Sequence, residues 1–303
     1  MQEIVCINES AFIKGRCIHD NYLLMRQVAR KINERREAGL FLKLDISRAF
    51  DSLSWPFLFQ AMRAKGFGQK WISWVAAILS TAMEIFGEAS GLRINYQKTM
   101  VILIRGTEEH RHRVEHILHY GLGNFPCKYL GIQLAIKALT RPDWQPLLDQ
   151  VRKCIPAWQR GLIQHPGRLI LVKYVIAARP LHQLIVLNAP EWVLEDIEKW
   201  MRSFFWAGKD KVNGGQCLVA WSQVFRPTRF GGLGIKDLRL QAIALRVRWD
   251  WLKRADPNRP WQGLKLMDDE AASLVLNSLV KIIVGNGARV LFWKDRWIHG
   301  FTI

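Results

Sequence analysis

Residues 40–55, LFLKLDISRAFDSLSW, contain the residue types and spacing best suited to binding a catalytic metal. Asp45 ends a run of apolar and β-prone residues, and Phe50 and Asp51 follow five and six positions later. A strand that ends in a carboxylate can present that group to Mg²⁺, because Mg²⁺ prefers oxygen ligands. The pattern therefore predicts a strand that ends at Asp45 and offers one carboxylate for metal-dependent chemistry.

The rest of the sequence predicts the elements that surround this carboxylate. Apolar residues recur at helical spacing, and prolines and glycines mark several helix ends. We expect helices over residues 19–36, 55–65, 69–90, 143–160, 167–178, 190–207 and 237–254. We expect two strand pieces within 93–104, one strand over 128–135, a β-prone or irregular stretch over 214–234, and a strand or turn over 290–298. These elements indicate an α+β fold.

The charge balance favours a polyanionic partner. Lys and Arg total 44 against 26 Asp and Glu, a formal charge of +18 over 303 residues. The segment 151–190 holds six basic residues and no acidic one, together with Trp158 and Tyr174. Cations interleaved with aromatics suit phosphate contacts and base stacking, although a solvated helix face has the same composition. We therefore expect binding of RNA and DNA without sequence preference, through Arg152, Lys153, Arg160, Arg168, Lys173 and Arg179.

The remaining composition narrows the class of protein. Half of the residues are hydrophobic, which excludes a disordered tail, and five cysteines without a CxxC pair argue against a disulfide framework or a standard zinc finger. No apolar run reaches the roughly 18 residues of a membrane span, and the N-terminus lacks the pattern of a signal peptide. We expect an intracellular protein of the nucleus or cytoplasm with no membrane partner.

Four histidines suggest a second metal hypothesis. His110, His112, His116 and His119 lie in the stretch EEHRHRVEHILHY, the last three at helical spacing. Histidines four residues apart on a helix can bind zinc, but no clear fourth ligand is nearby. We favour an exposed helix that carries both signs of charge.

Eight short blocks in a fixed order resemble the reverse transcriptases of plant LINE-type (non-LTR) retrotransposons. They are SAFIKGR, KLDISRAFDSLSW, SGLRINYQKT, KYLGIQL, PGRLILVKYV, FFWAG, GGLGIKDL and FWKDRWIHG, and they are distributed from Ser10 to Gly300, so the resemblance extends over nearly the whole chain. The resemblance implies an incomplete right-hand polymerase. Its parts would be a fingers and palm remnant over 1–135, a helical thumb-like region over 136–208 and a Trp-rich C-terminal region over 209–303.

The same resemblance assigns roles to individual residues. Asp45 would be a Mg²⁺ ligand, Phe50 would lie beside the nucleotide sugar, and Lys98 would assist the departure of pyrophosphate. Lys14 and Arg16 would lie where the fingers approach phosphate, although a solvated turn fits them equally well.

Two catalytic blocks of that family are missing between Thr81 and Met83. The family has a template-contacting Gln-Gly-Asp-Pro block there, followed by a hairpin with an Ala-Asp-Asp sequence, and neither block occurs in this chain. Nucleotidyl transfer by two metals needs several converging carboxylates, which Asp45 alone does not supply. The acidic pair Asp268-Asp269 precedes a helical pattern far downstream, where acids favour a helix start.

The sequence therefore predicts an internally deleted, inactive relative of these reverse transcriptases. Asp45 would be vestigial, its magnesium site incomplete, and the Mg²⁺ of the family would have no function here. Two alternatives stay open: an active enzyme whose catalytic block is missing only from the gene prediction, and a non-functional translated pseudogene product.

Overall fold

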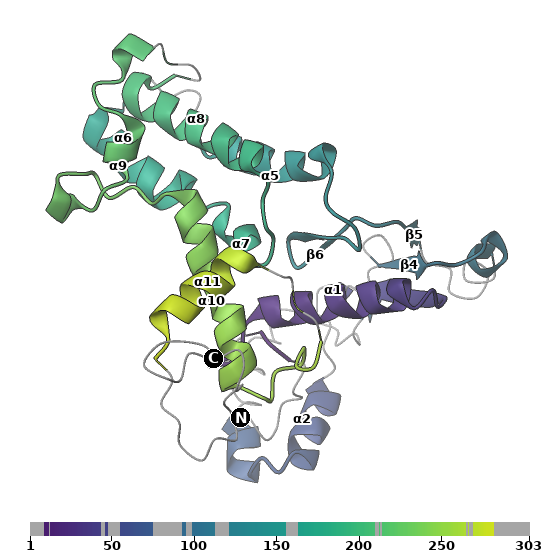
Figure 1. Cartoon of the computed structure of the whole chain (residues 1–303). Helices are drawn as coiled ribbons and strands as arrows, with labels where there is room; N and C mark the ends of the chain where they lie inside the picture. The colour runs from purple at the N-terminus through teal and green to yellow at the C-terminus, as the bar shows by residue number, and fades with distance from the viewer. Residues whose placement is uncertain are drawn as a thin grey trace. The chain divides into compact units, whose positions relative to one another are not determined.

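The computed structural model has a mixed α+β fold that is mostly helical with small sheets (Figure 1), which confirms the predicted class. It describes residues 9–11, 13–43, 46–47, 55–74, 93–94, 99–112, 121–155, 163–209, 212, 214–264, 266 and 269–281. Two compact units form along the chain. Unit 1 comprises Met1–Glu9 and Val28–Cys127, and unit 2 comprises Ser10–Gln27 and Lys128–Ile303. The polymerase arrangement of these parts and the three ranges expected from the resemblance remain predictions.

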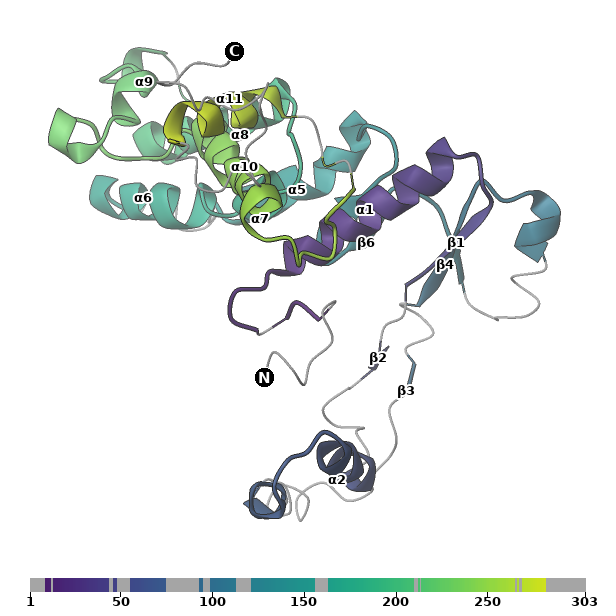
Figure 2. The same ribbon diagram turned by 60° about the horizontal axis from the view of Figure 1, so that its bottom comes forward.

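Unit 1 contains a three-stranded sheet in the order β1-β4-β5, formed by Gly39–Lys43, Met100–Ile104 and Gly121–Gly123. Strands β1 and β4 run antiparallel, side by side in Figure 2, with Phe41 opposite Ile102. Side chains alternate between the two faces of a strand, so Phe41 is buried whereas Leu40 and Leu42 are exposed. Strand β1 is therefore an edge strand with one apolar face in water, within the described part of the sheet.

The rest of unit 1 follows the sequence pattern where it is described. Helix α2 is Trp55–Ala64 and ends before Gly66, whose φ of 79° suits a residue without a side chain. Strands β2 and β3, Ile46–Ser47 and Arg93–Ile94, form a short antiparallel pair. Residues 69–74 are helical, and the remainder of the helix predicted over 69–90 lies outside the described residues.

Unit 2 is built mainly from helices, of which α1 also extends into unit 1. Their bounds are α1 Ile18–Glu34, α5 Arg141–Lys153, α6 His165–Leu171, α7 Leu181–Leu184, α8 Glu191–Ala207, α9 Trp221–Val224, α10 Leu238–Ala255 and α11 Glu270–Leu279. The fully buried side chains Val172, Ile197 and Phe204 lie at the centre of this packing. Helix α11 contacts α10 along its length, as Figure 1 also shows.

Several helix ends lie where the sequence signals them. Pro190 is the N-cap of α8, and Gly208 ends that helix with a φ of 63°. Asp237 caps α10 by accepting a hydrogen bond from the backbone N–H of Arg239. Asp269 likewise caps α11 through the N–H of Ala272, which confirms that the acid there begins a helix.

Three sequence expectations need correction. The single strand predicted over 128–135 is a hairpin of β6 Cys127–Tyr129 and β7 Ile132–Leu134, because Leu130 and Gly131 both adopt positive φ, 50° and 83°. The helix predicted over 167–178 begins earlier as α6 and continues as a π-helix, η1 Val172–Ile176. The β-prone alternative for the glycine-rich stretch 214–234 is wrong, because its described residues form short helical turns, η2 Gly214–Gln216, α9 and η3 Thr228–Phe230, and no strand, which suits the irregular alternative.

Among the described helices, none combines the length and the apolar character that a bilayer span requires.

Candidate nucleic-acid interface

The residues expected at a polymerase centre lie outside the described residues. Strand β1 ends at Lys43, two residues before Asp45. Phe50 and Lys98 are also outside the described ranges. Elsewhere in the described part, no group of three His, Cys, Asp or Glu residues is arranged to hold a metal ion. The magnesium site and its geometry therefore stay predictions from the sequence.

Three cations of the acid-free segment are exposed. Arg152 and Lys153 form the last turn of α5, and Arg179 follows η1. The guanidinium carbon of Arg152 lies 5.9 Å from the ring centroid of Trp200 on α8, which holds this arginine over an aromatic face. Basic groups at a helix C-terminus are stabilised by the helix dipole, yet all three remain open to an anionic partner.

Two other cations of the segment make intramolecular hydrogen bonds. Arg168 donates from Nε to the carbonyl of Ile163 at 2.8 Å and from Nη1 to the carbonyl of Trp206 at 3.3 Å. Lys173 donates from Nζ to the carbonyl of Leu233 at 3.4 Å. A phosphate contact would compete with these hydrogen bonds. Arg168 and Lys173 therefore contribute to the packing of α6 and η1 and are less available to an anionic partner than the exposed cations. Arg160 lies outside the described residues.

An exposed aromatic side chain, Tyr174, lies beside Lys173. Tyr174 is 66% exposed, and its ring lies 5.7 Å from Nζ of Lys173. Ile170, one helical turn earlier, is 58% exposed. Tyrosine gives a large flat surface on which a base can stack, so this face combines charge with an aromatic platform.

Lys14 and Arg16, which the sequence resemblance places near phosphate, lie in a turn that is hydrogen-bonded to the C-terminal region. Lys14 is exposed and Arg16 is half-buried, and Gly15 between them has a φ of 83°. The carbonyl of Gly15 accepts a hydrogen bond from Nη2 of Arg259 at 3.0 Å. The structure thus fixes this turn, but it does not bring Lys14 or Arg16 to the exposed cations of α5.

Sequence reasoning missed the buried acid that organises this turn. Asp20 is 2% exposed and accepts hydrogen bonds from Nη1 of Arg259 at 2.7 Å and from Nε1 of Trp261 at 2.8 Å. The backbone N–H of Cys17 donates to the same carboxylate at 3.2 Å. We call Asp20, Arg259 and Trp261 the Asp20 clasp. A charge in the first turn of a helix was a visible signal, but its partners lie about 240 residues away.

A chain of hydrogen bonds next to this clasp joins Cys17, His19 and His182. His182 Nε2 lies 2.9 Å from the carbonyl of Leu130 and so acts as a donor, which leaves its Nδ1 as the acceptor for His19 Nε2 at 3.1 Å. His19 Nδ1 then accepts from the thiol of Cys17 at 3.0 Å. Burial lowers the pKa of His19, and the nearby Arg248 lowers it further, whereas the carbonyl of His182 and Asp20 act in the opposite direction. The lowered pKa favours the neutral form of His19.

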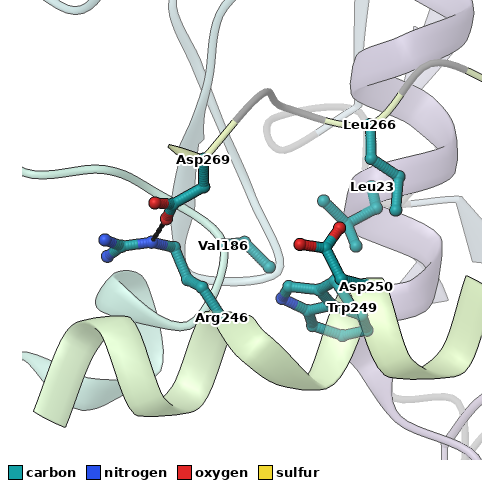
Figure 3. Close-up of a pocket in the computed structure, with 7 residues that line it drawn as sticks. All are labelled: Leu23, Val186, Arg246, Trp249, Asp250, Leu266 and Asp269. Carbon is teal, nitrogen blue, oxygen red and sulfur yellow. Dashed lines mark hydrogen bonds and ion pairs between the residues drawn. The ribbon is translucent and has the colours of Figure 1, made fainter. Parts of the chain in front are cut away.

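A small pocket in unit 2 offers little free chemistry (Figure 3). Leu23, Val186, Arg246, Trp249, Asp250, Leu266 and Asp269 line it. Arg246 forms a buried ion pair with Asp269, and the hydroxyl of Ser273 donates to Asp250 at 2.7 Å. These charged groups are satisfied within the protein, so the pocket is not the candidate interface.

Comparisons with known proteins connect the chain to transposons. No protein-family model matches it. It is 24% identical over 189 residues, 54% of this chain, to the "Putative ribonuclease H protein" of Arabidopsis thaliana. It is 19% identical over 353 aligned residues, 86% of this chain, to the "Transposon TX1 uncharacterized 149 kDa protein" of Xenopus laevis. The chain spans 30% and 26% of these two relatives. It is a distant homologue of both, consistent with an origin in a non-LTR retroelement.

Proposed function

We propose that this chain is an internally shortened derivative of a LINE-type reverse transcriptase that binds RNA and DNA without catalysing polymerisation. The observation that carries the binding function is that Arg152, Lys153, Tyr174 and Arg179 are all exposed and belong to a forty-residue segment of the sequence without an acid. Phosphates would contact the three cations and a base would stack on Tyr174. Contacts of this kind bind strands of any sequence.

The alignment with the Xenopus protein supports the loss of an internal block. It extends over 353 residues, whereas 86% of 303 residues is about 260 residues of this chain. About 90 residues of the relative (353 minus 260) are therefore opposite gaps in this chain. Gaps of this total length are large enough to include the two catalytic blocks expected between Thr81 and Met83.

The number of free cations determines the expected salt dependence of binding. If Arg152, Lys153 and Arg179 each neutralise one phosphate, the slope of log K against log salt should be about −2 for a single strand and about −3 for a duplex. Arg168 and Lys173 are excluded from this estimate because carbonyl oxygens already occupy them.

A fluorescence-anisotropy titration at several salt concentrations tests the binding function. The charge reversals Arg152→Glu, Lys153→Glu and Arg179→Glu should each weaken binding to all sequences alike and make the slope shallower. Lys253→Glu is the matched control, because Lys253 is an exposed cation in the last turn of another helix, α10. Salt-independent binding, or an equal effect of the control, would show that the segment is a solvated face.

A primer-extension assay tests the loss of catalysis. The purified chain should not extend a primer on an RNA template with Mg²⁺ or Mn²⁺, because one palm aspartate does not hold two metal ions. Extension that Asp45→Asn abolishes would refute this part of the proposal. The alignment gap also suits an active enzyme whose block is absent only from the gene prediction, so the transcript should be sequenced across the codons of Thr81–Met83.

A further inference from the structure

Two exposed tryptophans in unit 1 have no role in the proposed function. Trp71 and Trp74 are 51% and 53% exposed, and their ring centroids lie 6.1 Å apart with the planes inclined by 65°. They are three residues apart in the helical segment 69–74 and so share one face, whereas Ile72 between them is 2% exposed. Ile72 contributes to the packing of the unit, and the indoles lie on the solvent side.

The surroundings of this pair are basic. Nζ of Lys70 lies 5.4 Å from the ring centroid of Trp74, and Arg63 and Lys65 are exposed in the preceding turn of the chain. The sequence has no Asp or Glu between residues 55 and 74. A hydrophobic protein partner would not require this excess of positive charge, whereas a polyanion would complement it.

Flat aromatic rings beside cations, in a stretch of sequence without an acid, favour one class of partner. A base can stack on an indole whatever its identity, because every base has a π-face. In a duplex these faces are covered by neighbouring base pairs, so stacking needs an unpaired strand. The inclined planes of the two indoles also require successive bases to separate from each other, which a flexible strand allows.

We propose that Trp71 and Trp74, with Arg63, Lys65 and Lys70, form a binding site for single-stranded nucleic acid. Bases stack on the two indoles, and the three cations contact the phosphates on either side. The site lies in unit 1 and shares no residue with the exposed cations Arg152, Lys153 and Arg179 of unit 2. It therefore adds selectivity for unpaired strands to the phosphate binding described above.

The test is anisotropy of the full chain with a fluorescent oligo(dT) and with a duplex of the same length. The double variant Trp71→Ala/Trp74→Ala should weaken oligo(dT) binding by about 10- to 100-fold, at a cost per stacked base typical of such sites. Its duplex affinity and its salt slope should stay within about twofold of wild type, because the phosphate contacts remain. Trp251→Ala is the matched control, since Trp251 on α10 is 48% exposed.

Further experiments distinguish base stacking from charge effects and from protein–protein contacts. An oligonucleotide without bases should bind to the wild type about as weakly as oligo(dT) binds to the double variant. Lys70→Glu should weaken the binding of both oligo(dT) and the duplex. Photo-crosslinking with 5-iodouracil should place adducts on Trp71 or Trp74. The inference is overturned if the oligonucleotide without bases binds as well as oligo(dT), or if adducts occur only elsewhere. It is also overturned if the double variant alters only self-association in sedimentation velocity, which would assign the face to a second copy of the chain.

The two proposals fail in different ways. The proposed binding by unit 2 is refuted if the charge reversals Arg152→Glu and Arg179→Glu leave nucleic-acid binding unaltered, whatever the effect of the tryptophan variants. The proposed single-strand site is refuted if wild type and the double variant bind oligo(dT) with equal affinity while the charge reversals in unit 2 still weaken binding.

Discussion

The Asp20 clasp provides the strongest test of the packing in unit 2. Asp20→Asn keeps the shape of the side chain but removes the charge that faces Arg259, whose side chain is 11% exposed. Removing one partner of a buried ion pair costs about 3–5 kcal/mol, because the remaining charge is left in a poor solvent. Arg259 also donates to Asp256 at 2.8 Å and to the carbonyl of Gly15, so we expect a loss near the lower limit, about 3 kcal/mol.

Chemical denaturation followed by circular dichroism measures this loss. Asp256→Asn is the control, because it removes a charge from the same arginine at a position that is 36% exposed, where an ion pair contributes at most about 1 kcal/mol. A loss below about 1 kcal/mol for Asp20→Asn, or equal losses for both variants, would refute the assigned burial. The absence of any cooperative transition in the wild type would instead favour the pseudogene alternative.

Three further predictions concern stability and local opening. Burial lowers the pKa of His19, so protonation of this side chain favours the unfolded state. The contribution of His19 to the free energy of unfolding should therefore be fully present above about pH 6.5 and decrease by at most about 1.4 kcal/mol per pH unit below it. Denaturation of wild type and His19→Gln at pH 5 to 8 measures this slope, which the variant should reduce. Gly232→Ala should destabilise by about 1–3 kcal/mol in thermal unfolding, because its Cβ would lie 2.0 Å from the carbonyl oxygen of Arg226, whereas Gly215→Ala, with open space around it, should be nearly neutral. Hydrogen exchange should be faster in the edge strand Gly39–Lys43 than in Glu191–Ala207, and equal protection would indicate that β1 is covered on both sides.

The helices could be predicted from the sequence where the signals are local. Helix α8 lies between Pro190 and Gly208, and α10 begins after Asp237, so period and caps together gave their bounds within one or two residues. The β6–β7 hairpin was not predicted because its turn requires a positive φ at Leu130, and a leucine in a sequence does not indicate this conformation. The sequence also did not reveal the π-helical turn after α6.

The candidate interface could be predicted only in outline. Composition identified the basic segment, but all of its cations look alike in a sequence. The structure separates exposed Arg152 from Arg168, whose hydrogen bonds to carbonyl groups depend on residues brought together by folding. The Asp20 clasp was beyond sequence reasoning for the same reason, since its partners follow about 240 residues later.

The larger part of unit 1, Val28–Cys127, interrupts unit 2 in the sequence, and Met1–Glu9 also belongs to unit 1. The polypeptide leaves unit 2 after Gln27 and returns to it at Lys128, so a frame-preserving excision between these points removes no residue of unit 2. The Asp20 clasp would survive such an event, because all of its members lie outside the inserted interval. Conversely, a fragment that starts at Lys128 would lack Asp20 and leave the indole N–H of Trp261 without its acceptor. The hydrogen bonds within unit 2 are therefore separable from residues 28–127, but the boundary after Gln27 lies inside α1, so an expression fragment that keeps this helix intact has to include residues up to Glu34.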